Sequence, residues 1–162
     1  MNIFDHAMRF EKEGAKLYRE FARKASTDGL KTIFSWLALQ EDHHCAIIAG
    51  MKAEKPGIRL RKINYRGMTR IFRALKKDVD EGDIGRSDAK LYRMALAAEK
   101  RSMDFYSRKA RTVRDGNSRK ILFALSAEEK KHYTLIDNLI EFITEPETWV
   151  ENAEFARLDR ED

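Results

Sequence analysis

Apolar residues recur at steps of three and four along four long segments of the chain, which is the spacing of an amphipathic α-helix. The predicted helices span about residues 3–25, 30–53, 87–113 and 118–143. Turn-forming residues separate the two members of each pair, at residues 26–29 (STDG) and 114–117 (RDGN). Because short turns make neighbouring helices antiparallel, the pattern predicts an all-α fold, an antiparallel four-helix bundle built from two helix pairs.

A crossover of residues 54–86 joins the pairs, and residues 68–79 within it fit a short amphipathic helix. From Lys52 to Lys77 the chain carries ten Lys or Arg and one Glu. This stretch is either a solvated linker or a docking surface for an acidic electron donor. Its apolar positions are expected to pack on the bundle or on a second subunit: Met68, Ile71, Phe72 and Leu75.

The predicted bundle occupies residues 1–145, and residues 146–162 form a C-terminal tail. The tail begins at Pro146, which does not continue a helix. Residues 149–158 fit a short C-terminal helix, and Trp149 is expected to cover the end of the bundle.

Composition narrows the class of protein. The length of 162 residues suits one domain with a sizeable core. The formal charge of +5 is modest and its basic and acidic residues are interleaved, so nucleic-acid binding is not indicated. No apolar run reaches the length of about 18 residues that a membrane span needs. The single cysteine, Cys45, permits no internal disulfide and favours a reducing cytoplasm.

The two halves of the chain repeat each other at a shift of 88 positions. The segment FEKEGAKLYREFA aligns with AEKRSMDFYSRKA, and IFSWLALQEDHHCAI aligns with ILFALSAEEKKHYTL. Unrelated helix pairs would not keep this register. The aligned polar and tyrosine residues are Glu11 with Glu99, Tyr18 with Tyr106, Glu41 with Glu129 and His44 with His132.

These repeated polar residues interrupt the apolar stripes of their helices, about midway along each, so they are expected to point at the bundle axis. Four inward carboxylates repel one another, and an unpaired buried charge is strongly unfavourable. No Lys or Arg lies on these stripes, whereas two divalent cations would balance the four charges. A Glu and a His three residues apart share a helix face. Oxygen ligands with two imidazoles and no thiolate suit iron or manganese.

One Glu on each of two helices and Glu-x-x-His on the other two is the pattern of ferritin-like di-iron carboxylate proteins. The sequence resembles the rubrerythrin branch of this ferritin-like superfamily over about residues 1–145. The resemblance rests on Glu11-x6-Tyr18, on Leu37-x3-Glu41-x2-His44 and on their repeats. It implies a centre of two iron ions, with manganese or mixed metal as alternatives. The implied ligands are Glu11, Glu41, His44, Glu99, Glu129 and His132.

The resemblance also implies an activity. Rubrerythrins reduce hydrogen peroxide at the di-iron centre with electrons from a donor, so we expect an oxidoreductase acting on peroxide or oxygen, in a setting of oxidative stress. Tyr18 and Tyr106 match tyrosines that hydrogen-bond the carboxylates, with ordinary core packing as the alternative. One cysteine is too few for a rubredoxin-like domain, which implies an external electron-donor protein. Ser102 and its repeat partner Gly14 stand where rubrerythrins commonly have an additional glutamate. The sequence therefore leaves open whether this chain completes the peroxidase cycle of the family.

Two other functions remain open from the sequence. The chain could be an iron-binding ferroxidase for iron handling or sequestration, or a metal-free helical interaction module. A homodimer is possible. Several residues near the candidate site are expected to lie at the surface, and Cys45 to be a small core or boundary residue. Those expected at the surface are His6, Glu13, Asp42, His43 and Glu128.

Overall fold

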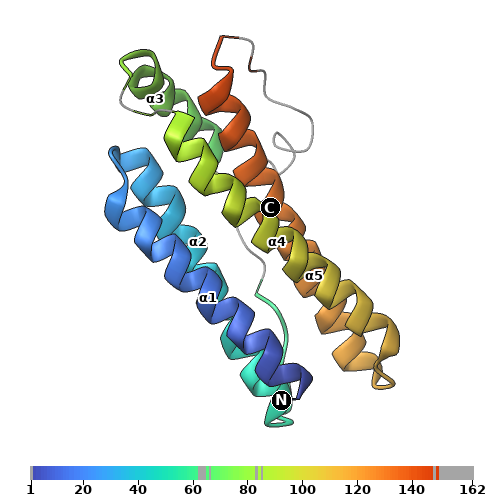
Figure 1. Ribbon diagram of the computed structural model, residues 1–162. Coiled ribbons are helices and arrows are strands. Elements are labelled where there is room, and N and C mark those ends of the chain that lie inside the picture. The colour runs from blue at the N-terminus through green and yellow to red at the C-terminus, as the bar shows by residue number, and fades with distance from the viewer. Residues whose placement is uncertain are drawn as a thin grey trace.

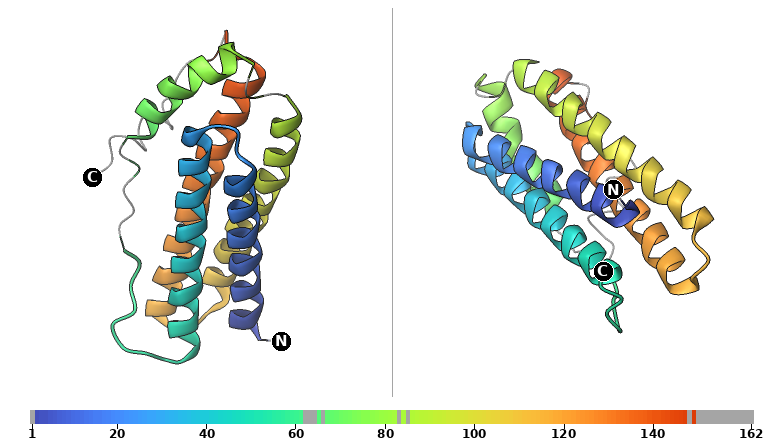
Figure 2. Two further views of the ribbon diagram at one scale, coloured as in Figure 1. Left: turned by 90° about the vertical axis from the view of Figure 1, so that its left-hand side faces the viewer. Right: turned by 60° about the horizontal axis from the view of Figure 1, so that its bottom comes forward.

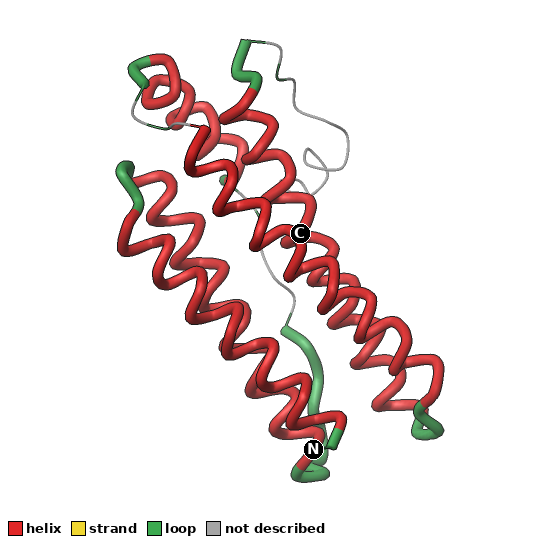
Figure 3. The backbone as a smooth tube through the Cα atoms, viewed as in Figure 1, coloured by secondary structure: helices red, strands yellow, loops and turns green. Residues whose placement is uncertain are grey.

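The computed structural model describes residues 2–61, 65, 67–82, 84, 86–147 and 149, and all regular structure within them is helical (Figures 1 and 3). The all-α bundle predicted from the sequence is therefore confirmed. Four long helices and a short one are present, close to the predicted ranges. They are α1 (Ile3–Lys24), α2 (Asp28–Lys52), α3 (Met68–Asp80), α4 (Arg86–Thr112) and α5 (Gly116–Thr144).

The helices are arranged as two antiparallel pairs, α1 with α2 and α4 with α5, which share the largest interfaces. Between the pairs, α1 also contacts α4 and α2 contacts α5. The crossover returns along the length of the bundle to α3, which lies across its upper end (Figure 2). As a result α2 and α4 run in the same direction.

Both turns within the pairs are shorter than predicted, because each contains a residue that caps the following helix. The Thr27 hydroxyl accepts a hydrogen bond from the Leu30 N–H at 3.2 Å, and the Asp115 carboxylate accepts one from the Ser118 N–H at 2.7 Å. Such side chains satisfy backbone groups that the helix leaves free. Thr27 and Asp115 are 88 residues apart, so the repeat extends to the caps. The helix at Ser87 begins one residue earlier than predicted, at Arg86.

The short helix α3 belongs to the hydrophobic core. Met68, Phe72 and Leu75 are buried in the cluster that fills this end of the bundle, so the predicted packing of this segment on the bundle is confirmed. Gly29, in the first turn of α2, lets α3 approach closely. A Cβ atom at that position would lie 2.8 Å from Leu75 Cδ2.

Trp149 covers the end of the bundle, as expected. Its ring centroid lies 5.2 Å from that of Phe142 and 5.9 Å from that of Phe72. The remainder of the predicted C-terminal helix lies outside the described residues. Of the helices that the structure describes, none combines the length and the apolar character needed to cross a bilayer.

The burial of α3 predicts the effect of truncating its central side chain. Phe72→Ala should lower the free energy of unfolding by about 3–5 kcal/mol, because it removes a fully buried ring that contacts the end of α5. Urea unfolding of the metal-free protein measures this loss. Arg73→Ala changes an exposed residue of the same helix and should shift the value by less than about 0.5 kcal/mol. Equal effects of the two variants would contradict the packing of α3 on the core.

Candidate metal centre

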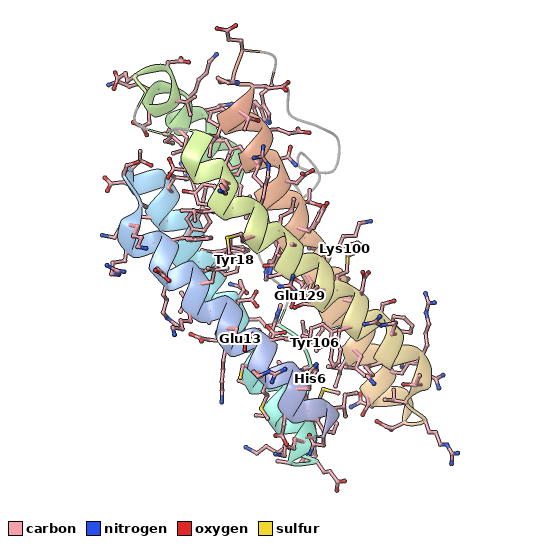
Figure 4. All side chains as sticks on the ribbon, viewed as in Figure 1. His6, Glu13, Tyr18, Lys100, Tyr106 and Glu129 are labelled. Carbon is pink, nitrogen blue, oxygen red and sulfur yellow. The ribbon has the colours of Figure 1, made fainter. Side chains whose placement is uncertain are left out.

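All six predicted ligands lie together in the interior of the bundle. Their exposed fractions are between 0 and 4%, although four of them are glutamates. Glu11 comes from α1, Glu41 and His44 from α2, Glu99 from α4, and Glu129 and His132 from α5. Figure 4 shows Tyr18, Tyr106 and Glu129 between the two helix pairs, about midway along the bundle.

The ligand atoms form two groups that share two residues. One group contains Glu11 and His44, the other Glu99 and His132, and both contain Glu41 and Glu129. Within each group, one ligand atom from every residue lies within 4.8 Å of the others. These residues could hold two cations, with Glu41 and Glu129 available as ligands to both.

The imidazole Nδ1 atoms face these carboxylates. His44 Nδ1 lies 3.0 Å from Glu129 Oε1 and 3.4 Å from Glu11 Oε2. His132 Nδ1 lies 3.0 Å from Glu41 Oε1 and 3.3 Å from Glu129 Oε2. The two imidazole rings are nearly parallel, with centroids 5.4 Å apart. Each histidine therefore approaches a carboxylate of the opposite helix pair.

Two tyrosines tie the helix pairs together at the site. The Tyr18 hydroxyl on α1 donates a hydrogen bond to Glu99 Oε1 on α4, and the Tyr106 hydroxyl on α4 donates one to Glu11 Oε1 on α1. Both tyrosines are buried. Each bond fixes the orientation of one carboxylate and leaves the second oxygen of that carboxylate facing the centre. The predicted contact of these tyrosines with the glutamates is present.

The shared carboxyl groups resist ionisation in this interior. Burial, followed by the charges of Glu129, Glu11 and Glu99, raises the pKa of Glu41 well above its ordinary value. Burial and the charges of Glu11 and Glu99 likewise raise the pKa of Glu129. A cation between them would reverse this effect by stabilising both carboxylates.

The unshared carboxyl groups show the opposite shift. Burial alone would raise the pKa of Glu11, but the nearby imidazole of His44, whose Nδ1 lies 3.4 Å from Glu11 Oε2, outweighs burial and lowers that pKa. At Glu99, burial is likewise outweighed by the charge of the nearby His132 imidazole, whose Nδ1 lies 3.6 Å from Glu99 Oε2, so the pKa of Glu99 is also lowered. The pKa shifts follow the sequence repeat, because the repeat partners Glu11 and Glu99 are both lowered and the repeat partners Glu41 and Glu129 are both raised.

The donor atoms of the site fit a metal centre. Within the described residues, several of its fully buried nitrogen and oxygen atoms have no hydrogen-bond partner. His132 Nδ1 and Glu41 Oε1 lie close together, yet their geometry is not that of a hydrogen bond. Buried polar atoms are normally satisfied, and a metal ion would satisfy oxygens and imidazole nitrogens that face one another. The unpartnered atoms are Glu11 Oε2, Glu41 Oε1, His44 Nε2, Glu129 Oε2, His132 Nδ1 and His132 Nε2.

A cavity of about 340 Å³ adjoins the site between α1 and α4. Glu41, Glu99 and Tyr18 line it together with Gly14 and Ser102. A Cβ atom at Gly14 would lie 2.9 Å from Glu41 Oε2, so the glycine leaves room for this carboxylate. Gly14 and Ser102, the two positions where an additional glutamate is common, therefore border the cavity.

The cavity also reaches the protein surface. Its lining includes Glu13, whose side chain is 68% exposed, and Met94, which is 61% exposed. A small molecule could approach the shared carboxylate Glu41 by this path.

Comparison with known families agrees with this geometry. The family model named Rubrerythrin matches residues 2–140 of the chain. The chain belongs to the rubrerythrin family. Neither the comparison with curated proteins nor that with solved structures gave a match. As a rubrerythrin-family protein with a buried Glu/His cluster, it carries the features of a metal-binding ferritin-like bundle.

Predictions for the flanking residues were right in part. Glu13 and Asp42 are exposed as expected. The expectation for Glu128 was wrong, because its side chain is only 12% exposed and pairs with Lys131 at 3.3 Å. Folding of the crossover against α5 covers it. His6 and His43 are half-buried instead of exposed.

Cys45 is the boundary residue that the sequence suggested. It is half-buried and its thiol lies 3.9 Å from the Met8 carbonyl oxygen.

Trp36 and Tyr65 were missed as neighbours of the site. The ring centroid of Trp36 lies 6.1 Å from that of His132. The sequence offered no signal for Tyr65, which comes from the crossover and has no partner in the repeat.

The sharing of two carboxylates predicts graded metal loss. After anaerobic Fe(II) loading and desalting, the wild type should retain about two irons per chain, the number that this ligand pattern holds in di-iron carboxylate proteins. Glu129→Ala should abolish most binding, because Glu129 belongs to both ligand groups. Glu99→Ala removes a ligand of one group and should retain more metal than Glu129→Ala. Elemental analysis gives the ratio.

Asp42→Ala is the matched control, since this exposed carboxylate is adjacent in sequence to Glu41. It should leave the iron content unchanged. Wild-type protein without bound metal, or equal loss in Asp42→Ala and Glu129→Ala, would contradict the assignment of the site.

The pKa shifts predict that the metal-free protein loses stability as the pH rises above about 5, where the unfolded carboxyl groups have released their protons. In this window, folded Glu41 and Glu129 keep protons that the unfolded chain has released, because their pKa values are raised from 4.5. Burial lowers the pKa of His44 but its contacts with Glu11 outweigh burial and raise it from 6.5, so its contribution is also lost as the pH rises.

Urea unfolding with a chelator at several pH values tests this trend. Glu129→Gln should reduce the slope, because it removes one titrating group without changing the shape of the side chain. Metal-loaded protein should gain stability over the same range, since ligands must lose protons to bind metal. A metal-free stability that increases with pH would contradict the shifts.

Proposed function

We propose that this chain is a rubrerythrin-like non-haem di-iron oxidoreductase that reduces hydrogen peroxide, or oxygen, with electrons from an external donor. The main supporting observation is a buried pair of ligand groups that share Glu41 and Glu129 and adjoin a cavity open to the surface. The proposed ligands would hold two iron ions, and the same donors would accept manganese or a mixed centre. They are Glu11, Glu41, His44, Glu99, Glu129 and His132.

The bound iron ions would supply the two electrons that reduction of a peroxide bond requires. The side chains of the protein position the ligands and surround the site with apolar residues. Tyr18 and Tyr106 hold one oxygen each of Glu99 and Glu11, which prevents these carboxylates from rotating away. Hydrophobic core clusters pack on both sides of the site and surround it with apolar side chains. In this role the tyrosines position the ligands.

The cavity between α1 and α4 supports access of a small oxidant to the site. Ser102 lines it with a small side chain, and Gly14 leaves room for the Glu41 carboxylate at its edge. Tyr18, whose hydroxyl group donates a hydrogen bond to Glu99, is also one of the residues that line the cavity. Peroxide and oxygen are small enough for this space, whereas a large organic substrate would not reach the ligands.

We propose an electron-donor protein as the partner and a reducing, cytoplasmic setting. The exposed face of α3 supports an acidic donor, because it carries a row of basic side chains. These are Arg70, Arg73, Lys76 and Lys77. Such a surface gives association that weakens as salt increases.

Rapid mixing of the reduced, iron-loaded protein with peroxide or with oxygen tests the proposed activity. We expect faster oxidation by peroxide and repeated turnover when a reductant is supplied. Ser102→Phe should slow oxidation several-fold at unchanged iron content, because the ring would occupy the cavity beside Glu99. Optical spectra of the iron centre follow the reaction.

A replacement outside the cavity provides the control. Lys100→Phe alters an exposed residue of α4 that pairs with Asp104, and it should leave the oxidation rate unchanged. Slow, stoichiometric oxidation with ferric iron accumulating beyond two per chain would reject the peroxidase proposal in favour of ferroxidase-type iron handling.

A further inference from the structure

The groove between α1 and α4 is filled on one side of the metal centre and open on the other. Towards the start of α1, His6 and Phe10 pack with Phe105 of α4, and their ring centroids lie 4.6–5.5 Å apart. Towards the end of α1, the cavity beside the ligands occupies the groove. Figure 4 shows His6 and Tyr18 on opposite sides of Glu129 along the bundle, with Tyr18 at the cavity. The two parts of one groove therefore differ in packing.

The sequence repeat accounts for this difference. At the shift of 88 positions, each aromatic residue of the filled part has a counterpart without an aromatic ring, and all three counterparts line the cavity. These are Met94 for His6, Ala98 for Phe10 and Leu17 for Phe105. The groove is closed where the repeat carries rings and open where it does not. The cavity is thus specified by particular residues and is not a gap left by loose packing.

The outer part of the cavity is apolar. Leu17 and Ala98 are half-buried there, and Met94 is 61% exposed at the mouth. Leu91, one helical turn before Met94, is 43% exposed, so the apolar surface continues beyond the mouth. Among the described residues, four large apolar side chains are exposed, and Leu91 and Met94 are two of them. Apolar surface that leads into a cavity is typical of a ligand site.

The inner end of the cavity is polar. Glu41, Glu99 and Tyr18 line it and are all buried. The Tyr18 hydroxyl donates a hydrogen bond to Glu99, and Glu41 Oε1 has no hydrogen-bond partner among the described residues. A molecule that enters therefore passes apolar side chains before its leading end meets the carboxylates of the candidate metal centre.

The size of the cavity exceeds what hydrogen peroxide needs. Its volume of about 340 Å³ is far larger than the roughly 30 Å³ that one water molecule occupies in the liquid. Sites for small organic molecules start at about 300 Å³. An apolar wall also offers no hydrogen bonds to hydrogen peroxide, whereas it stabilises an apolar group by removing it from water.

We propose that this cavity binds small organic hydroperoxides, with the apolar group in its outer part and the hydroperoxyl group at its inner end. The inference rests on the proposed function and names a substrate class for the same site. The apolar group would lie against Leu17, Met94 and Ala98. Only the hydroperoxyl end would reach Glu41 and Glu99, so the substrate is limited to groups that the outer part can hold.

The proposed reaction converts the hydroperoxide to an alcohol and water. The O–O bond breaks, and each oxygen atom gains one proton and forms one O–H bond or keeps its bond to carbon. Two electrons come from the reduced centre, and two protons come from solvent at the mouth of the cavity. The external donor of the proposed function returns the two electrons to the centre.

Binding of a product alcohol to the metal-free full-length chain tests the site without enzyme activity. The probe is 2-phenylpropan-2-ol, the alcohol formed from cumene hydroperoxide. We expect NMR to show contacts between its ring protons and the Met94 methyl group. Ala98→Phe restores the ring of the repeat partner and should weaken binding about tenfold or more, because the phenyl group of the probe loses its apolar contacts.

Ala97→Phe is the matched control, since it makes the same change at an exposed alanine that does not line the cavity. It should leave binding unchanged. Met94→Lys changes an exposed residue of the mouth and should also weaken binding, which keeps the test valid if Ala98→Phe does not fold. Absence of binding to the wild type, or equal loss in Ala97→Phe and Ala98→Phe, would overturn the proposed site.

Rapid mixing of the reduced, iron-loaded protein with cumene hydroperoxide or hydrogen peroxide tests the substrate class. Ala98→Phe should lower the rate with cumene hydroperoxide about tenfold more than the rate with hydrogen peroxide, since the added ring excludes the larger apolar group. Ala97→Phe should leave the ratio of the two rates unchanged. An unchanged ratio in Ala98→Phe would overturn the inference.

Failure of this inference and failure of the proposed function give different results. Reaction with hydrogen peroxide but neither alcohol binding nor reaction with cumene hydroperoxide would reject the inference alone. Absence of bound iron, or of reaction with either peroxide, would reject the proposed function and with it the reduction of organic hydroperoxides.

Discussion

Electrostatic repulsion among four carboxyl groups at the centre of the bundle constrains the rest of this structure. Each helix contributes one of these groups, and the interior around them offers two imidazoles but no lysine or arginine among its buried residues as described. Without a cation, Glu41 and Glu129 are driven towards the protonated state, which their raised pKa values express. Long apolar stripes above and below the site must hold the helices together against this repulsion.

The sequence repeat divides the four carboxyl groups equally between the two helix pairs. Each pair supplies one tyrosine that bonds a carboxylate of the other pair, and each supplies one histidine that faces a carboxylate of the other. Contacts across the centre thus bind the pairs to each other, although most helix packing occurs within a pair. A metal centre that bridges the pairs would add to this cohesion, because bound ligands stabilise the folded state.

Much of the site could be predicted because helical periodicity fixes direction. Once Glu41 and His44 fall on an apolar stripe, they must point inwards, and the repeat then identifies Glu129 and His132. Residues that approach the site without obeying the repeat were not predicted from the sequence. Tyr65 approaches the site through the crossover, whose path depends on tertiary packing. Glu128 was assigned to solvent by its helical position, and Tyr65, which contacts it, lies in the part of the crossover before residue 68, where the sequence has no helical periodicity.

The departures from the repeat occupy different sides of the centre, which bears on how it could work. The cavity lies between α1 and α4, the two helices that supply only glutamate ligands, and Glu41 of α2 also lines it. Trp36 lies on α2 and Tyr65 on the crossover, beside the histidine ligand of α5. A small molecule in the cavity would therefore meet carboxylates, whereas aromatic rings cover the histidine side of the centre. The departures from the repeat thus give a symmetric bundle two different faces, one open to the surface and one closed by packing.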